Sequence, residues 1–514
     1  MTDKTLAAID IGTNSFHLVI ASVNDKGIVK VLTKDKEVVR LGKSSTDMKY
    51  ISLDAMERGI AALKRFKITC DSFNAEIRAV ATSATREALN KDEFINEAYK
   101  RTGISIEVIS GYEEARLIYL GVLQALDIFD KRILLIDIGG GSTEFLVGEK
   151  GNVLYSNSIK LGAVRLTERF FNESKYLKEN IENARLHVRS IINPIVRNLK
   201  SERFDVVVGT SGTITNLGSI IYCRNSQDDF SQFNFNNYKY SDTDLYNSVK
   251  MILSLDNLAA VRKIEGLDSD RVDIISAGAI ILEQVFKEIG IKQIVLSTYA
   301  LREGILFDTI DKEHNTLQSE DMKNVRYRSV INLAKHCNYD EHHCKKILQL
   351  ALPVFDALRD KHNLTSQDLD LLEASIYLHD IGHSISHSQH HRHSYYLIKN
   401  SELLGFNNEE IEIIANISRY HRKSHPKAKH AEFNKLSAVN KTKVKMLAGI
   451  LRIADGLDRG HNSVIESINV NIMDNNFYIK VTPKEGKDPT LELWGANMRK
   501  ELFEEAFGYS ILIN

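Results

Sequence analysis

The sequence predicts an α/β fold for residues 1–310, then an all-α region, then a small α+β segment. Three observations support this order. Short β-branched apolar runs alternate with amphipathic helical stretches up to about residue 310, which is the pattern of α/β proteins. Helical periodicity dominates from Val325 to about Ala454. Alternation of apolar and polar residues, typical of strands, returns from about Val464.

Length and composition are those of an ordinary globular protein. The chain has 514 residues, of which 43% are hydrophobic and 26% charged, with 67 basic residues against 68 acidic ones. This composition excludes disordered, collagen-like and disulfide-stapled proteins. Since domains usually hold about 100 to 200 residues, we expect several of them. The predicted domains are 1–125, 126–310, 311–462 and 463–514.

Charge and cysteine usage indicate the compartment and exclude some partners. A net charge of −1 supplies no field to hold nucleic acid or an anionic membrane, so we expect neither partner. No run approaches the roughly 18 apolar residues that span a bilayer. The four cysteines lie far apart without a Cys-x-x-Cys pair, which suits reduced thiols. We therefore expect a cytoplasmic protein.

The clearest strand candidates contain an internal repeat. Apolar, β-branched runs predict strands at 7–11, 16–21, 133–138, 145–147 and 206–208. The segment LAAIDIGTNS at 6–15 recurs as ILLIDIGGGS at 133–142. Each copy predicts a strand that ends in Asp-Ile-Gly, a turn of small residues and a returning second strand.

The second copy of the repeat has the residues of a phosphate site. Glycines let backbone N–H groups approach phosphate oxygens closely, and hydroxyl groups add donors. Asp137, at the strand end, can hold Mg²⁺ directly or through water beside those oxygens. The candidate phosphate ligands of this copy are Gly139, Gly140, Gly141, Ser142 and Thr143.

The first copy offers the same groups from an opposing wall. Its candidate residues are Asp10, Gly12, Thr13, Asn14 and Ser15. Two such hairpins that face each other form a cleft for a chain of phosphates. A third segment, 205–214, is predicted as a strand, a glycine turn and a helix start, whose free N–H groups form a generic anion site. The phosphate ligands that this segment offers are Gly209, Ser211 and Gly212. A single glycine-rich turn is more often part of a hairpin than a ligand site, so the prediction of a phosphate site rests on the repeat.

These segments and two others together resemble a known family. They are DIGTNSFH at 10–17, ISGYEEARLI at 109–118, DIGGGSTE at 137–144, GTSGT at 209–213 and LREG at 301–304. In order and spacing they resemble the exopolyphosphatase and guanosine pentaphosphate phosphohydrolase family, which has an actin-like ATPase core. The resemblance covers residues 5–310 and implies two actin-like (ribonuclease H-like) domains that close over phosphates.

The resemblance also implies a Mg²⁺-dependent phosphoanhydride hydrolase. Glu114, the second glutamate of Gly-x-Glu-Glu-Ala-Arg, matches the family's base, which orients the attacking water. Asp137 and Glu144 would hold the metal and that water, and Asp10 would be a further Mg²⁺ ligand. The glycine turn at 139–142 would hold the phosphoryl group in its transition state.

Two arginines match family positions associated with phosphate-chain or alarmone binding. They are Arg86 and Arg271, and the alternative for both is an exposed helix residue without a placed partner. We interpret Glu113 as an exposed neighbour of the base and Arg116 as an ion-pair partner on the same helix. His17, inside a predicted strand, is more typical of a satisfied core histidine than of a catalytic acid.

Histidines are concentrated in the all-α region. Fifteen of the 17 lie between positions 314 and 461, a density that indicates metal or phosphate chemistry. An adjacent His-Asp pair on a helix can place both side chains on one metal, and His383 lies one turn beyond that pair. The four residues that match a metal site are His343, His379, Asp380 and Asp455, and His393 and His421 are candidates for a second ion.

The order His, His-Asp, late Asp resembles the HD phosphohydrolase superfamily, so this region is predicted to be HD-like. Nitrogen plus carboxylate ligands suit Mn²⁺, Fe²⁺, Zn²⁺ or Co²⁺. The alternative is that these histidines are hydrogen-bonded core and loop residues. A basic run follows at 419–445, with nine Lys and Arg and one acid. It is usually a solvated loop, although facing the cleft it would guide a polyanion.

We therefore predict an exopolyphosphatase that releases orthophosphate from the ends of inorganic polyphosphate, with hydrolysis of guanosine pentaphosphate to tetraphosphate as an overlapping activity. One alternative makes guanosine pentaphosphate the main substrate. Another is a non-catalytic sensor of alarmone or polyphosphate, against which the presence of Glu114 argues. A second phosphohydrolase site at His379 and Asp380 is a third alternative. From the resemblance we expect a homodimer.

Overall fold

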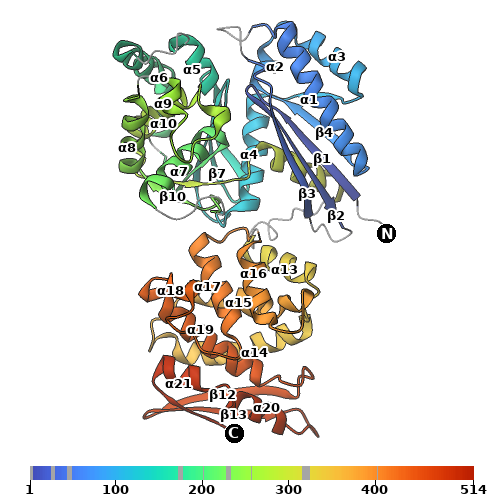
Figure 1. Cartoon of the computed structure of the whole chain (residues 1–514), viewed down its shortest axis with the longest axis vertical. Coiled ribbons are helices and arrows are strands. Elements are labelled where there is room, and N and C mark those ends of the chain that lie inside the picture. The colour runs from blue at the N-terminus through green and yellow to red at the C-terminus, as the bar shows by residue number, and fades with distance from the viewer. Residues whose placement is uncertain are drawn as a thin grey trace. The chain divides into compact units, whose positions relative to one another are not determined.

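The computed structural model describes residues 4–24, 29–42, 49–171, 177–200, 202–226, 233–255, 257–314, 325–401 and 403–514. The chain divides into two compact units, Met1–Val325 and Arg326–Asn514 (Figure 1). The first unit is α/β, and the second is mainly helical, as predicted. The finer domain boundaries within these units stay predictions.

The first sheet of the α/β unit has the strand order β3-β2-β1-β4-β5. Its strands are β1 (Lys4–Ile11), β2 (Ser15–Val23), β3 (Val29–Val38), β4 (Glu76–Ala81) and β5 (Ile106–Val108). The strand β1 is antiparallel to β2 and parallel to β4. The helices α1 (Leu53–Ser72) and α11 (Leu301–His314) both pack on this sheet, and α3 (Lys91–Thr102) packs on α1. Because helices cover the sheet, the centre of β1 is a continuous buried run.

The second sheet repeats the topology of the first. Its order is β10-β11-β9-β6-β7-β8, so that β8-β7-β6-β9-β11 corresponds to β3-β2-β1-β4-β5. The strands are β6 (Ile133–Ile138), β7 (Thr143–Glu149), β8 (Asn152–Ile159), β9 (Val206–Thr210), β10 (Lys239–Ser241) and β11 (Gln293–Leu296). Each sheet has its own hydrophobic core. The duplication expected from the sequence repeat is therefore confirmed, as is the α/β class of this region.

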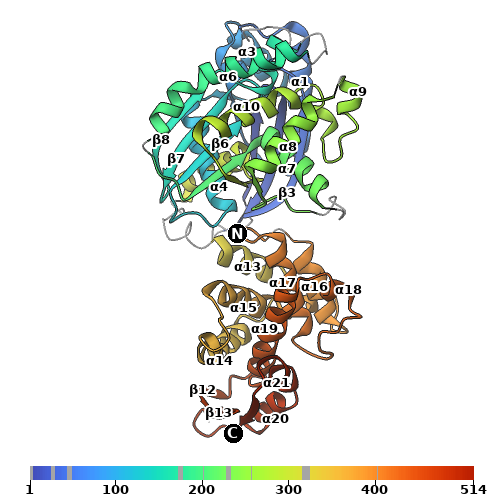
Figure 2. The same cartoon turned by 90° about the vertical axis from the view of Figure 1, so that its left-hand side faces the viewer.

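Helices surround the second sheet. Around α10 (Ile275–Ile289) pack α5 (Ala163–Phe170), α6 (Lys178–Leu199), α7 (Ser211–Asn225) and α8 (Asp242–Leu253). The short α9 (Leu258–Val261) follows α8. Figure 1 shows these helices beside the strands of the second sheet, and Figure 2 shows the same half of the unit from the side.

Two helices join the halves of the α/β unit. The helix α4 (Gly111–Ala125) packs on β7 and β8 of the second sheet, whereas α11 packs on β1, β2 and β4 of the first. They contact each other through glycines, since a Cβ atom at Gly304 would lie 1.8 Å from the carbonyl oxygen of Leu117. A Cβ atom at Gly121 would lie 2.4 Å from the carbonyl oxygen of Ala300. This close packing joins the middle of α4, the helix that carries Glu114, to the start of α11.

The second unit is built on helices with a small sheet. Its helices are α13 (Val325–His336), α14 (Glu341–Arg359), α15 (Ser366–Leu378), α16 (His390–Lys399), α17 (Asn408–Tyr420), α18 (Ala431–Asn434) and α19 (Ala438–Gly456). Capping boxes begin α15, at Thr365, and α17, at Asn407, which explains where these helices start.

The predicted C-terminal α+β segment is present. It consists of β12 (Ile465–Met473), β13 (Asn476–Pro483), α20 (Thr490–Asn497), α21 (Glu501–Phe507) and β14 (Ser510–Ile513). Figure 2 shows these elements together at the C-terminal end of the unit. Phe477 and Phe503 belong to the same buried core as Leu451 of α19. The segment and the helices therefore share one core. In the described part of the chain, no helix is both long enough and apolar enough to cross a bilayer.

Candidate functional site

A cavity of ≈ 300 Å³ in the α/β unit brings most of the predicted phosphate site together. Both sequence repeats reach it, and so do the first residues of α7 and α11 and the first turn of α4. The predicted residues that line it are Asp10, Gly12, Thr13, Asn14, Ser15, Glu114, Asp137, Gly139, Gly140, Gly141, Ser142, Ser211, Gly212 and Arg271. The two hairpins therefore open into one cavity rather than into separate ones.

The two turns close in the same way and lie against each other. The N–H of Gly12 donates to the carbonyl of Ser15 at 3.2 Å, and the N–H of Gly139 donates to the carbonyl of Ser142 at 3.0 Å. A Cβ atom at Gly140 would lie 3.1 Å from Cβ of Thr13, which is tighter than ordinary contact. Glycine at this position lets the opposing turns approach.

Two predicted phosphate ligands have structural roles instead. Gly209 lies inside β9, where a Cβ atom would come within 2.6 Å of both Ile214 and Ile294. The expected glycine turn is therefore a strand end, and the chain turns at Ser211, whose φ of 73° lies in the left-handed region. Thr143 is fully buried, and its hydroxyl donates to the carbonyl of Leu161 at 2.5 Å. Neither Gly209 nor Thr143 lines the cavity.

Glu114 is a buried carboxylate at the cavity wall. It lies in the first turn of α4, whose N-cap is Ser110, and only 6% of the residue is exposed. Arg86, on α2 (Ser83–Glu87), donates to Oε2 of Glu114 at 2.9 Å and to the carbonyl of Ile109 at 3.0 Å. Burial raises the pKa of Glu114, and the Arg86 guanidinium opposes this shift. Arg86 is thus neither a free surface residue nor a lining residue, but holds the candidate base.

Burial and mutual repulsion raise the pKa of three further acids at the site, of which Asp10 and Asp137 line the cavity and Glu144 does not. Burial, followed by the charges of Glu114 and Asp137, raises the pKa of Asp10 to about 8. Burial and Glu114 raise the pKa of Asp137 to about 7. Burial, then Glu114 and Asp137, raise the pKa of Glu144, which lies opposite Asp137 in the β6–β7 register and accepts a hydrogen bond from Ser158 at 2.8 Å. Burial therefore makes ionisation of these acids unfavourable, and their mutual repulsion adds to the effect.

This donor set fits a hard divalent cation. Carboxylate and hydroxyl oxygens are the ligands that Mg²⁺ prefers. Within the described residues these acids are not among the groups of three whose ligand atoms come within 4.8 Å of one another. A cation that keeps several waters and shares phosphate oxygens, as Mg²⁺ does, suits such an open arrangement.

Replacing Asp137 by Asn is expected to raise the Tm of the metal-free protein, and to raise it more near pH 8 than near pH 5. A carboxyl whose pKa rises from 3.8 to about 7 on folding binds its proton more tightly when folded. It therefore lowers the free energy of unfolding increasingly as pH rises through that window. Asn carries no charge and removes this penalty. Thermal unfolding in EDTA measures the effect, with Glu113→Gln as the matched control. Equal Tm shifts at both pH values would contradict it.

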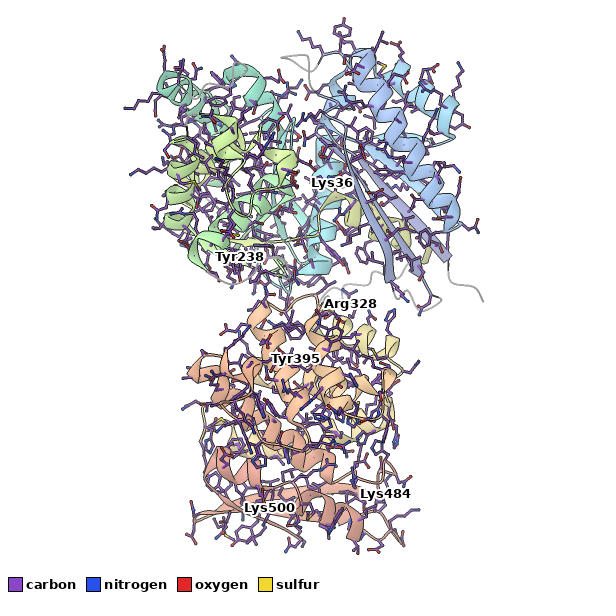
Figure 3. The ribbon with its side chains drawn as sticks, viewed as in Figure 1. Lys36, Tyr238, Arg328, Tyr395, Lys484 and Lys500 are labelled. Atoms are coloured by element: carbon purple, nitrogen blue, oxygen red, sulfur yellow. The ribbon has the colours of Figure 1, made fainter. Side chains whose placement is uncertain are left out.

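Three cationic side chains line other parts of the cavity, and only Arg271 among them was predicted from the sequence. Lys36 of β3 lies 2.8 Å from a carboxylate oxygen of Asp268 and 3.0 Å from one of Asp270, and Figure 3 labels it. Nothing local in the sequence marks Lys36, because strand pairing brings it there. Arg302 belongs to the Leu-Arg-Glu-Gly motif and lies 3.4 Å from Nδ1 of His17. Arg271 packs on Gly212, where a Cβ atom would lie 1.6 Å from its Nη2.

Of three residues outside the predicted set, Arg116 has the role expected of it, whereas Glu113 is only partly exposed and His17 lines the cavity. Burial, followed by the charge of Arg302, lowers the pKa of His17 to about 3, so this histidine is neutral at physiological pH and cannot serve as an acid. It does line the cavity, however. Arg116 pairs with Glu113 at 2.7 Å and with Asp308 at 2.6 Å. Arg116 therefore has the structural role expected of it.

The helical unit brings the predicted histidine site together in part. Ligand atoms of His343, His379 and Asp455 lie within 4.8 Å of one another, and so do those of Asp380, His383 and His390. His421 Nε2 lies 3.4 Å from Asp380. His393 lies almost one turn after His390 on α16 and belongs to neither group. His390, rather than His393, therefore belongs to the second group of candidate ligands.

Positions 419–445, the basic run, are spread over several elements. Arg419 pairs with Glu432 at 2.8 Å, Lys443 with Asp368 at 2.6 Å and Lys445 with Glu505 at 2.7 Å. At least these three charges are thus locally neutralised.

Comparison with known proteins gives the family. The model of the Ppx/GppA phosphatase family matches residues 19–313, and the model of Ppx/GppA phosphatase, domain III, matches residues 325–501. An exopolyphosphatase from Cytophaga hutchinsonii is 30% identical, with a TM-score of 0.56, over 60% of this chain and 98% of that one. A Ppx/GppA family member from Aquifex aeolicus is 26% identical, with a TM-score of 0.51, over 61% and 99%.

A third solved structure, an exopolyphosphatase-like protein, is 28% identical, with a TM-score of 0.55, over 60% of this chain and 98% of that one. The family that the motifs resemble is thereby confirmed. Because the first family model alone covers more than half of the chain, this protein belongs to the Ppx/GppA phosphatase family.

Proposed function

We propose that this protein is an exopolyphosphatase that hydrolyses the terminal phosphoanhydride bond of inorganic polyphosphate and releases orthophosphate. The observation that carries the proposal is that one cavity holds Glu114, two opposed glycine turns and the cations Arg271, Lys36 and Arg302. Family membership and the similarity to solved exopolyphosphatases support the same reaction class.

Substrate binding follows from the donors of the cavity. The backbone N–H groups of the turns at 12–15 and 139–142 suit phosphate oxygens. The cations of Arg271, Lys36 and Arg302 compensate successive phosphate charges. Among the described lining residues there is no Phe, Tyr or Trp on which a guanine base could stack. We therefore rank polyphosphate above guanosine pentaphosphate, whose hydrolysis to tetraphosphate is the overlapping activity.

The reaction uses Glu114 as general base. The water oxygen attacks the terminal phosphorus, its proton passes to the Glu114 carboxylate, and the bond to the bridging oxygen breaks so that the shortened chain leaves. Arg86, 2.9 Å from Glu114, orients the carboxylate and favours its ionised form against the effect of burial. Asp10, Asp137 and Glu144 are the residues that would hold Mg²⁺, which when bound stabilises negative charge on the transferred phosphoryl group.

Phosphate release from long-chain polyphosphate tests the proposal. We expect release with Mg²⁺ and little or none in EDTA, and a kcat/KM on polyphosphate above that on guanosine pentaphosphate. A higher kcat/KM on guanosine pentaphosphate would reverse the ranking. Binding of either compound without any phosphate release would favour the sensor.

Three further proposals come from the sequence. An HD-like helical unit and a homodimer rest on the motif resemblance, and a cytoplasmic location rests on cysteine usage and the short apolar runs. The mass in solution, measured by light scattering, tests the last of these, and a monomer at all concentrations would exclude it.

A further inference from the structure

The start of α5 binds the glycine turn at 139–142 through the carbonyl groups of the turn. The first two N–H groups of α5 donate to the carbonyls of Gly139 and Gly140, both at 2.9 Å. The guanidinium of Arg165, in the same helical turn, donates through Nε to the carbonyl of Gly141 at 3.0 Å. Three successive carbonyl groups of the glycine turn are therefore bound by one turn of helix.

These bonds set the direction of the N–H groups of the turn. In a trans peptide, a carbonyl and the N–H of the following residue point to opposite sides, and the described residues contain no cis peptide bond. Carbonyls that point toward α5 therefore direct the N–H groups of Gly140, Gly141 and Ser142 away from it. All three residues line the cavity. Arg165, through the carbonyl of Gly141, thus orients the N–H of Ser142 toward a bound phosphoryl group.

Arg165 also contacts the other half of the α/β unit. Its Nη2 lies 3.0 Å from Oε1 of Glu87 on α2, and Nζ of Lys160 lies 2.9 Å from Oε2. Figure 1 shows α2 and α5 at the same end of the unit. The side chains of Arg165 and Glu87 are 14% and 11% exposed, whereas that of Lys160 is 73% exposed. Because ion pairs that are shielded from solvent are screened less, Arg165 is the partner that holds Glu87.

The preceding residue of α2 holds the candidate base. Arg86 donates to Glu114 at 2.9 Å and to the carbonyl of Ile109 at 3.0 Å, and Glu87 follows Arg86 directly. One short helix of the first half thus binds the base through one residue and, through the next residue and Arg165, the glycine turn of the second half. Both contacts therefore contribute to the distance between the carboxylate of Glu114 and a phosphoryl group in the turn.

We propose that Arg165 and Glu87 are positioning residues of the hydrolysis reaction. Arg165 orients the glycine turn toward the phosphoryl group, and Glu87 joins Arg165, and with it the turn, to the helix that holds the base. Neither side chain lines the cavity, so both act through other groups. The expected effect on the reaction rate rests on the proposed function, whereas the expected effect on phosphate binding does not.

Binding of orthophosphate to the full-length protein, measured by isothermal titration calorimetry, tests the role of Arg165. Arg165→Met keeps the aliphatic part of the side chain but removes the donors to Gly141 and Glu87, and it is expected to weaken binding about tenfold. Lys160→Gln is the matched control, because it also removes a positive charge beside Glu87 but leaves the bonds to the turn intact. It is expected to keep the wild-type affinity. Equal affinity of the wild-type protein and folded Arg165→Met overturns the proposal, as does a wild-type protein that binds no orthophosphate.

Steady-state kinetics on polyphosphate test the role of Glu87. Glu87→Ala leaves Arg165 bonded to Gly141, so KM is expected to stay within a few-fold of the wild-type value. We expect kcat to fall about 10- to 100-fold, because the base and the turn are no longer held at a fixed distance. Loss of a negative charge would by itself tighten the binding of an anion, so charge does not explain a lower kcat. A wild-type kcat in Glu87→Ala, or a loss confined to KM, contradicts the proposal.

Two further comparisons make the test decisive. In an Arg165→Met background, Glu87→Ala should lower kcat no further, since the contact is already lost, and additive losses would assign the effect of Glu87 to another partner. Thermal unfolding shows whether each variant folds, and Arg165→Lys or Glu87→Gln replaces one that does not. If the wild-type protein releases no phosphate from polyphosphate, the proposed function fails. The orthophosphate titration then still decides the role of Arg165, on which that of Glu87 depends.

Discussion

Replacing Glu114 by Gln is expected to lower the rate of phosphate release from polyphosphate by about 10²–10⁴-fold, the usual contribution of a general base. Glutamine keeps the size of the side chain and can still accept the hydrogen bond that Arg86 donates at 2.9 Å. It cannot take a proton from water. Because the substitution removes a negative charge from the cavity, binding of polyphosphate is expected to be unchanged or tighter. Steady-state kinetics and equilibrium binding of labelled polyphosphate measure the two effects separately.

Glu113→Gln is the matched control for this variant. Glu113 precedes Glu114 in the first turn of the same helix, but it pairs with Arg116 at 2.7 Å and does not line the cavity. Its replacement is expected to leave kcat within a few-fold of the wild-type value. Wild-type phosphate release by Glu114→Gln would show that another group accepts the proton.

Replacing Gly212 by Ala is expected to raise KM for polyphosphate by about 10- to 100-fold, which corresponds to the loss of one hydrogen bond to a charged group. The new Cβ atom would lie 1.6 Å from Nη2 of Arg271, at the place that the guanidinium occupies. The end of an arginine side chain can move, so the backbone stays and the guanidinium is displaced. A smaller change in kcat is expected, because Glu114 is not touched. Phosphate release at varied polyphosphate concentration measures KM and kcat.

Two comparisons separate this effect from a general loss of packing. Gly218→Ala, on the same helix, displaces the end of a core side chain instead. The new Cβ atom of residue 218 would lie 2.4 Å from Cδ1 of Leu296, so Leu296 must move. It is expected to lower the Tm without raising KM. In an Arg271→Ala background, Gly212→Ala should add nothing, because the displaced group is already absent. Additive losses in the double variant would assign the effect of Gly212→Ala to something other than Arg271.

Local features made part of the site predictable from the sequence. The Asp-Ile-Gly repeats predict two hairpins because a strand, a glycine turn and a returning strand involve only neighbouring residues. Both hairpins form, and each closes with a bond from its glycine N–H. Glu114 was assigned from the motif around it, and the structure places it in the same cavity.

Long-range packing decided the rest. Lys36 reaches the cavity because β3 pairs with β2, and no nearby residue marks it. Gly209 has the local sequence of a phosphate turn, yet its contacts with Ile214 and Ile294 make it a packing position in β9. In the helical unit, spacing alone could not separate His390 from His393.

The sequence by itself therefore determined the α/β and helical regions, the two hairpins and the candidate base. The regions and the hairpins follow from hydrophobic periodicity and from turn chemistry, which act over a few residues, whereas the candidate base follows from the resemblance of its motif to the family. Only the tertiary structure decided which cations and which histidines meet, because side chains on different elements come together through the packing of helices and the register of strands. That is why Arg86 holds Glu114 and why His390, rather than His393, faces Asp380.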